Sequence, residues 1–224
     1  MSAMSTNFAA QRTNMVESQL RPNQITDEAV LTAMEELPRE IFVPAALADV
    51  SYVDEDLTIA PGRTILEPMV QARLVQSASI KPGERVLEIA CGMGYGTALL
   101  VKLGAKVTAI DIDSTLLAAA ATNLRRLGLS AELVAAPFER GMPEHGPYDV
   151  IIVSGAVAAV PDAWGKQLTE AGRLLVVVRA DNGVAQNGAA QLYLKTANGL
   201  VAKNLFAAQT PYLPGLAAPQ RFTF

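Results

Sequence analysis

The sequence is poor in the residues on which several common kinds of protein chemistry depend. It has one cysteine, Cys91, so no intramolecular disulfide can form, and we expect a reducing, cytoplasmic setting. Its one histidine, His145, argues against a two-histidine metal site and against a serine–histidine–aspartate centre. We therefore predict no bound metal, and we interpret His145 as a turn residue rather than a catalytic one.

Excess positive charge and long apolar runs are also missing. The 224 residues carry a formal net charge of −4 without a run of lysine and arginine, so we expect no nucleic-acid partner. No apolar stretch approaches the roughly 18–20 residues of a membrane span, and residues 1–11 do not resemble a signal peptide. Half of the residues are hydrophobic, which is typical of a globular protein with a sizeable core. The oligomeric state is left open.

The front of the chain, residues 1–80, has helical patterns separated by a long loop. Thr26 is placed to cap a helix that Pro38 ends, and Pro68 suits the first turn of a later helix. The expected helices cover about 8–20, 27–37 and 68–79. We interpret this part as a helical amino-terminal extension that carries a substrate loop.

From residue 81 to 224, apolar strands alternate with helices. The expected strands cover 86–90, 106–111, 132–136, 149–154 and 173–179, with helices at about 97–103, 114–128 and 161–169. Ser114 is placed to cap the second of these helices. Such strands are typical of a parallel sheet covered on both faces. Asn198 and Gly199, between two further apolar runs, predict an antiparallel hairpin at the end. We predict an α/β fold, a Rossmann-like parallel sheet with a terminal antiparallel hairpin, which forms one compact domain with the extension.

A glycine-rich turn follows the first expected strand. Gly92 and Gly94 permit a tight turn and the close approach of a ligand, at the edge of the sheet where open α/β folds bind their ligands. Asp111 ends the next strand, 19 residues beyond Gly92, where a carboxylate can accept hydrogen bonds from both ribose hydroxyls. The alternative is a surface aspartate that caps the next helix. The pattern favours a site for an adenosine-containing ligand.

Glu88 bears on which adenosine ligand is bound. The pyrophosphate of a dinucleotide prefers helix-end amides without a nearby anion, and Thr97 stands at the third glycine position of the dinucleotide pattern. S-adenosylmethionine carries an ammonium and a sulfonium but no phosphate, so a carboxylate before the turn favours it. Glu88 then holds the ammonium, or else it braces the turn. A nicotinamide-dependent oxidoreductase is the remaining alternative.

Several short motifs between Met15 and Leu213 occur in an order that resembles a known family. They are Met15-Val16 with Gln19-Leu20, residues 38–44 (Pro-Arg-Glu-Ile-Phe-Val-Pro), residues 62–68 (Gly-Arg-Thr-Ile-Leu-Glu-Pro), residues 81–89, and residues 143–149. Together they resemble the protein-L-isoaspartate O-methyltransferases. The resemblance implies a Rossmann-like S-adenosylmethionine-dependent methyltransferase with a protein or peptide substrate. It implies methyl transfer to the free α-carboxylate of an isoaspartyl residue, which starts repair through a succinimide.

The motifs and the resemblance together assign the site residues. The substrate side comprises Thr64, Ile65, Leu66 and Pro68. The cofactor side comprises Glu88, Ala90, Cys91, Gly92, Gly94, Asp111, Ile112, Pro137 and Phe138. We also expect residues 211–214 to help close the site. An α-carboxylate, with a pKa of about 3.3–3.7, is already ionised at neutral pH, so the reaction needs alignment and exclusion of water rather than a general base.

Three positions depart from the family pattern. Leu66 stands where the family has an active-loop serine, and Thr64 is the nearest substitute for its hydroxyl. Ala90 replaces the first glycine of the loop, and Pro137 replaces an aspartate that receives the adenine amino group, which leaves Phe138 to pack on the adenine. Two alternatives therefore remain open. The chain is a methyltransferase of the same ancestry with a different acceptor, or a catalytically weak cofactor-binding protein.

Overall fold

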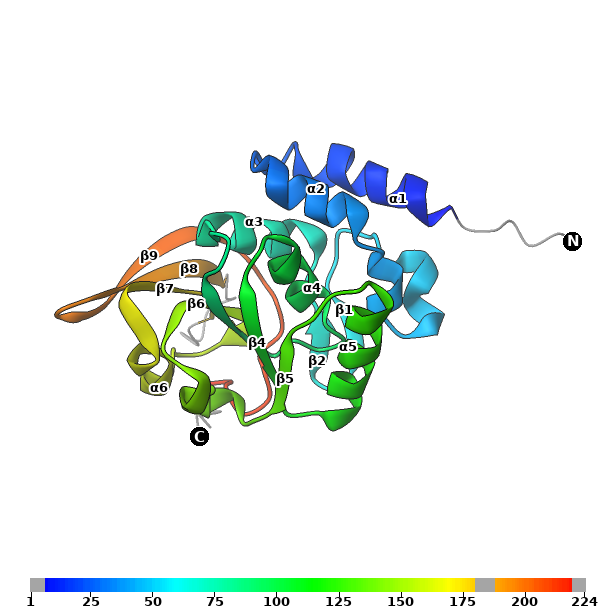
Figure 1. Cartoon of the computed structure of the whole chain (residues 1–224). Coiled ribbons are helices and arrows are strands. Elements are labelled where there is room, and N and C mark those ends of the chain that lie inside the picture. The colour runs from blue at the N-terminus through cyan, green and yellow to red at the C-terminus, as the bar shows by residue number, and fades with distance from the viewer. Residues whose placement is uncertain (1–6, 180–187, 219–224) are drawn as a thin grey trace, which may run out of the picture.

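A mixed sheet of seven strands forms the centre of the structure, a computed structural model that describes residues 7–179 and 188–218 (Figure 1). The strands are β3 (Arg85–Ile89), β4 (Lys106–Asp111), β5 (Glu132–Ala135), β6 (Tyr148–Val157), β7 (Leu168–Val178), β8 (Ala189–Thr196) and β9 (Gly199–Ala207). Their spatial order is β5-β4-β3-β6-β7-β8-β9. Strands β3 to β7 are mutually parallel, whereas β8 pairs antiparallel with both β7 and β9. This confirms the predicted parallel sheet with a terminal antiparallel hairpin.

Helices cover both faces of the sheet. They are α1 (Phe8–Met15), α2 (Glu28–Glu36), α3 (Pro68–Ala78), α4 (Tyr95–Lys102), α5 (Ser114–Arg126) and α6 (Asp162–Lys166). The larger hydrophobic core joins α3, α4 and α5 to one face, and α6 contributes Trp164 to a second core on the other. Figure 1 shows α1 and α2 lying over α3, outside the sheet layers. The helical amino-terminal extension is therefore confirmed.

Two predicted helix caps were wrong by one residue. The side chain of Asp27, not Thr26, accepts hydrogen bonds from the first turn of α2. Asp113 performs the same role for α5, so Ser114 is its first helical residue. In both cases the aspartate has an extended backbone, which aims its carboxylate at the free amides of the helix. Because Asp113 caps α5, Asp111 is not the cap.

The long loop before Pro68 contains structure that the sequence patterns did not predict. It includes two short 3-10 helices, η2 (Arg39–Phe42) and η3 (Ala45–Val50). After them, β1 (Leu57–Ala60) and β2 (Arg63–Ile65) form a small antiparallel hairpin with Gly62 in its turn. We call β1, β2 and their turn the β1–β2 hairpin. It places the predicted substrate residues beside the carboxyl ends of β3 and β4.

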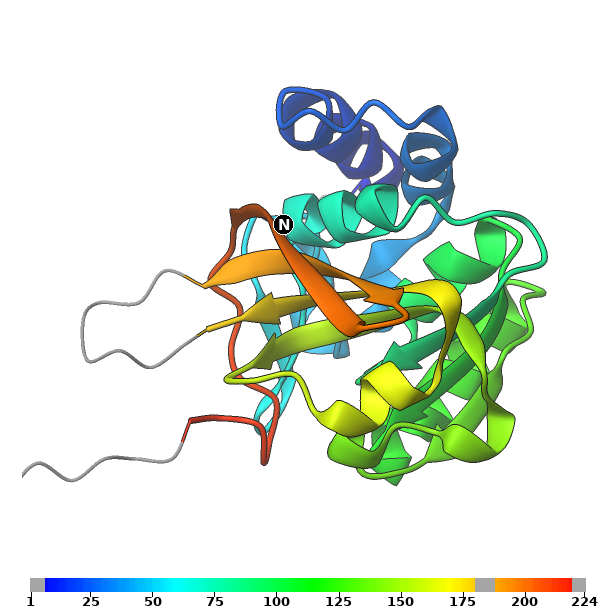
Figure 2. The ribbon, with the colours of Figure 1, turned by 90° about the vertical axis from the view of Figure 1, so that its left-hand side faces the viewer.

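The carboxyl-terminal segment returns to this side of the molecule. Tyr212 forms a parallel bridge with Ala156 of β6, and the backbone of Leu213 donates to the Ala156 carbonyl at 2.8 Å. Pro214 lies against the turn of the β1–β2 hairpin, where a Cβ added to Gly62 would be 3.2 Å from it. Figure 2 shows this segment running beside the hairpin. In the described ranges, no helix combines the length and apolar character that crossing a bilayer requires.

Candidate active site

The glycine-rich turn lies at the carboxyl end of β3, where the strand order reverses between β4 and β6. The backbone of Ala90 and Cys91 donates to the carbonyl of Ile110, which fixes the turn against β4. Gly92 and Gly94 have φ values of 55° and 93°, in the left-handed region that glycine adopts without strain. The turn is therefore built for close approach, at the position where open α/β sheets bind ligands.

Ala90 also has a left-handed backbone, with a φ of 69°. Its side chain is buried, so the methyl group fits, but in a conformation that costs an L-residue roughly 1–2 kcal/mol. The family's glycine at this position would avoid that strain. The alanine therefore fits sterically, but it lowers the stability of the folded state relative to glycine.

Asp111 lies fully buried at the end of β4, and its role as the ribose-binding carboxylate stays a prediction. Its Oδ2 accepts hydrogen bonds from the backbone of Gly92 at 2.8 Å and from Arg63 Nη2 at 2.6 Å. Its Oδ1 accepts from the backbone of Asp113 at 3.2 Å and, at 3.4 Å, from Arg63 Nε. The carboxylate thus joins the glycine-rich turn to the β1–β2 hairpin.

Arg63 is the main residue of this site that the sequence patterns missed. It comes from β2, is 2% exposed, and forms a buried ion pair with Asp111. Its guanidinium carbon also lies 5.1 Å from the ring centre of Phe138. The sequence does contain a clue to this role, because Arg63 is a basic residue inside the motif at residues 62–68. Such a residue could pair with a carboxylate on the cofactor side.

Glu88 lies buried on β3 behind the turn. Ser154 Oγ donates to Glu88 Oε1 at 3.0 Å, and Thr97 Oγ1 donates to Oε2. A Cβ added to Gly96 would overlap Oε1, so the carboxylate packs directly on the first turn of α4. Burial raises the pKa of Glu88 to about 7. Glu88 therefore braces the turn, and its role as a ligand for the ammonium stays a prediction.

The predicted substrate residues gather across from the glycine-rich turn. Thr64, Ile65 and Leu66 line a narrow cavity together with Gly92 and Ser154. Pro68 is buried as the first residue of α3. The cavity volume is about 10 Å³, close to what a single water molecule needs. A larger ligand therefore requires some of the residues that line this cavity to move.

The remaining predicted cofactor residues are placed differently. Phe138 is buried, and the guanidinium of Arg63 lies over its ring. Ile112 is 49% exposed, and Pro137 lies at the surface just before Phe138, so neither lines the narrow cavity. Cys91 is buried, and burial raises the pKa of its thiol well above the ordinary value, which suits a small apolar filler rather than a nucleophile.

A buried arginine holds the substrate loop from behind. Arg39 donates through Nη2 to the carbonyl of Leu66 and through Nε to the carbonyl of Ser51, both at 2.6 Å. Its guanidinium lies over the ring of Tyr95, 4.8 Å from the centroid, and burial lowers its pKa. Tyr95 in turn makes an edge contact with Phe42. Arg39 belongs to the motif at residues 38–44, but its contact with the loop was not predicted.

His145 lies near the amino-terminal ends of the parallel strands, whereas Asp111 lies at their carboxyl ends. Its Nδ1 is 2.7 Å from Glu132 Oε2, at the amino-terminal end of β5. It therefore takes no part in the site at the carboxyl ends of the strands. Within residues 7–179 and 188–218, no three His, Cys, Asp or Glu side chains are grouped so that they could hold a metal ion.

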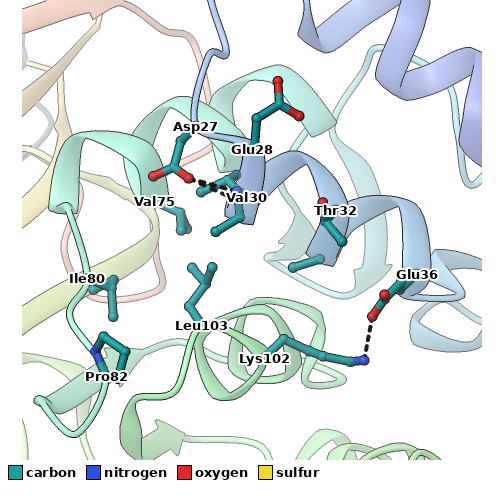
Figure 3. A pocket seen from close by; sticks show the side chains of 12 residues that line it. Asp27, Glu28, Val30, Thr32, Glu36, Val75, Ile80, Pro82, Lys102 and Leu103 are labelled. Atoms are coloured by element: carbon teal, nitrogen blue, oxygen red, sulfur yellow. Dashed lines mark hydrogen bonds and ion pairs between the residues drawn. The ribbon is translucent and has the colours of Figure 1, made fainter.

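A larger hollow, of about 520 Å³, lies between α2 and α4 (Figure 3). Apolar side chains such as Val30, Val75 and Leu103 line it, and Glu36 and Lys102 form an ion pair at 2.7 Å on its rim. It has no lining residue in common with the narrow cavity. The larger hollow is therefore separate from the predicted site.

A glycine-rich turn after β3, an acidic residue ending β4 and this strand order are typical of S-adenosylmethionine-dependent methyltransferases. The model of one family within this class, protein-L-isoaspartate(D-aspartate) O-methyltransferase, matches residues 10–215. The chain belongs to this family.

Individual relatives agree with the family assignment. The chain is 41% identical over 174 residues to a protein-L-isoaspartate O-methyltransferase of Methylorubrum populi, and the aligned region covers 78% of this chain and 82% of the relative. It is 38% identical over 206 residues to a protein-L-isoaspartate O-methyltransferase of a Synechococcus species, and this aligned region covers 90% of this chain and 84% of the relative.

Solved structures agree with the fold. One protein-L-isoaspartate O-methyltransferase is 27% identical with a TM-score of 0.78, covering 92% of this chain and 67% of that one. A Plasmodium falciparum structure in complex with S-adenosyl-L-homocysteine is 20% identical with a TM-score of 0.75, covering 92% and 98%, and supports the fold alone.

Proposed function

We propose that this chain transfers the methyl group of S-adenosylmethionine to the free α-carboxylate of isoaspartyl residues in proteins or peptides. Family membership over residues 10–215 supports this reaction. The observation that carries the proposal is the placement of Thr64, Ile65 and Leu66 across a narrow cavity from the glycine-rich turn. Residues predicted for the substrate side and for the cofactor side, from distant parts of the sequence, thus line the same cavity.

The chemistry of the residues present fits the cofactor. Asp111 supplies a buried carboxylate for the ribose hydroxyls, and Glu88 supplies one near the turn for the ammonium. Phe138, under the guanidinium that pairs with Asp111, supplies an aromatic face for the adenine. Bound S-adenosylmethionine brings a methyl group that its positively charged sulfur activates toward nucleophiles.

The protein has to bind and orient the acceptor and to exclude water. Ile65 and Leu66 are 7% and 1% exposed, so the acceptor side of the cavity is apolar and closed. A carboxylate acceptor is already ionised at neutral pH, so no base has to remove a proton from it. Alignment of the attacking oxygen in a site without competing water is the main contribution that these residues can make.

Leu66 motivates a second candidate, a methyltransferase of the same family with a different acceptor. Its side chain belongs to the hydrophobic core and brings no hydroxyl to the cavity. An acceptor less polar than an isoaspartyl residue would suit such a wall.

Transfer of labelled methyl from S-adenosylmethionine separates the two candidates. The acceptors are an isoaspartyl peptide and the matched peptide with a normal aspartyl residue. Transfer to the isoaspartyl peptide alone supports the proposed function. Absence of transfer to either peptide, with folded protein, contradicts it and favours a different acceptor.

A further inference from the structure

The carboxylate of Asp111 has no remaining capacity to accept hydrogen bonds. Arg63 donates to both of its oxygens, and the backbone N–H groups of Gly92 and Asp113 donate one bond each. A carboxylate offers about four lone-pair sites, so these four donors fill it. Ribose hydroxyls can therefore bond to Asp111 only when the guanidinium of Arg63 leaves.

Arg63 also covers the aromatic face that the adenine would use. Its guanidinium carbon is 5.1 Å from the centroid of Phe138, and both side chains are buried. One face of a ring cannot hold a guanidinium and an adenine at the same time. Arg63 and the adenosine part of the cofactor thus compete for Asp111 and for Phe138.

The displaced guanidinium would stay on the substrate side. Arg63 immediately precedes Thr64 on β2 and is three residues before Leu66. A guanidinium binds a carboxylate through two parallel hydrogen bonds, and Arg63 already contacts both oxygens of Asp111. The acceptor of the proposed reaction is itself a carboxylate, and Leu66 offers it no hydroxyl.

Resting on the proposed function, we propose that Arg63 exchanges one carboxylate for another. It binds Asp111 until the ribose of the cofactor takes that carboxylate, and it then binds the α-carboxylate of the acceptor. Arg63 is thereby an acceptor-binding residue that replaces the missing hydroxyl at position 66. The exchange also orders the reaction, because the acceptor gains its partner only after the cofactor has bound.

The first test measures binding of S-adenosylhomocysteine by calorimetry, without any methyl transfer. Arg63→Ala should bind it at least about tenfold more tightly than the wild type, because no guanidinium has to be displaced. Arg63→Lys keeps the charge without the paired donors and should fall between the two. Arg73→Ala is the matched control, since Arg73 stacks on Phe206 at 4.0 Å outside the site, and its affinity should be unchanged. Unchanged or weaker binding by folded Arg63→Ala and Arg63→Lys would overturn the competition.

The second test measures binding of a labelled isoaspartyl peptide to protein saturated with S-adenosylhomocysteine. The comparison is with the same peptide whose α-carboxylate is a carboxamide. The wild type and Arg73→Ala should prefer the carboxylate by about tenfold or more, whereas Arg63→Ala should bind both peptides alike. Arg63→Lys should keep part of the preference. No preference in the wild type, or a full preference in Arg63→Ala, would overturn the exchange.

The two proposals fail in different ways. A wild type that prefers the carboxylate peptide but transfers no methyl group to it contradicts the proposed function and leaves the exchange standing. A wild type that methylates the peptide, while Arg63→Ala keeps its preference for the carboxylate, contradicts the exchange alone.

Discussion

The guanidinium of Arg39 donates to the carbonyl oxygen of Leu66 at 2.6 Å, and this contact ties η2 to the loop that carries the substrate residues. Both partners are buried, and Arg39 also holds the carbonyl of Ser51 and covers the ring of Tyr95. Since Tyr95 begins α4, one side chain links the amino-terminal part, the substrate loop and the glycine-rich turn.

Arg39→Lys should therefore weaken both stability and catalysis. A lysine cannot reproduce the two separate hydrogen bonds to Ser51 and Leu66, and a buried carbonyl left without its donor costs about 1–3 kcal/mol. We expect a loss of that size in urea unfolding and a lower kcat/KM, because the loop loses its support. An unfolding free energy equal to that of the wild type would show that Arg39 does not hold the loop.

Leu66→Ser should destabilise the protein without improving methyl transfer to an isoaspartyl peptide. Leu66 is 1% exposed and belongs to the larger core, so the change leaves a cavity and buries a hydroxyl, at a cost of about 2–4 kcal/mol. Leu124→Ser, in the same core but on α5, is the matched control for the stability loss. A kcat/KM above that of the wild type for Leu66→Ser alone would mean that a hydroxyl at this position is what the reaction lacks.

Ala90→Gly should stabilise the protein. The left-handed backbone of Ala90 costs about 1–2 kcal/mol, and glycine removes that cost while adding about 0.5–1 kcal/mol of backbone entropy. A net gain of up to about 1.5 kcal/mol is expected in thermal or urea unfolding. Ala98→Gly, inside α4, should instead lose about 1 kcal/mol. If both variants lose stability, the strain at Ala90 is absent.

Glu88 should make the stability of the protein depend on pH. Burial raises its pKa to about 7 from an ordinary value of 4.5, so the folded state favours the protonated carboxyl. The stability that this form contributes is complete below about pH 4.5 and is lost as the pH rises through 7. Glu88→Gln should therefore be more stable than the wild type at pH 8, by about 1–3 kcal/mol, with a smaller difference at pH 5. Equal pH profiles for the two proteins would contradict this.

Glu88→Gln, which should raise stability at pH 8, should at the same time weaken cofactor binding. If the Glu88 carboxylate holds the ammonium of the cofactor, the wild type should bind S-adenosylmethionine more tightly at pH 7.5 than at pH 5.5. Glu88→Gln should bind it more weakly and with little difference between the two pH values. Calorimetry at both pH values tests this, and unchanged affinity in Glu88→Gln would leave Glu88 with its role in bracing the turn alone.

Much of the fold could be predicted because local patterns determine it. Apolar runs the length of a strand, separated by helices, predicted β3 to β7, and Asn198-Gly199 predicted the final hairpin. The β1–β2 hairpin was missed because its strands have four and three residues and an irregular register between Thr58 and Ala60. Such short strands carry no recognisable alternation. The helix caps were missed because Thr26 and Ser114 each adjoin an aspartate that caps better.

The site was predictable where it follows the strand ends, and less so where it depends on the hairpin. Asp111 is buried at the carboxyl end of β4, and Phe138 is buried under the guanidinium of Arg63; the roles expected of both in cofactor binding stay predictions. Arg63 contacts Asp111, which is 48 residues away in the sequence, because the β1–β2 hairpin brings it there, and no local sequence pattern predicted that hairpin. Ile112 follows Asp111 directly but lies at the surface, since neighbouring residues at a strand end point to opposite sides.

The most direct test of the central claim follows the isoaspartyl peptide itself by mass spectrometry in the presence of S-adenosylmethionine. We expect the isoaspartyl peptide to gain one methyl group, then to lose methanol and form a succinimide, and finally to give some normal aspartyl peptide. The matched normal aspartyl peptide should remain unchanged. Methylation of both peptides alike, or of neither by folded protein that binds the cofactor, would contradict isoaspartyl methyl transfer by this protein.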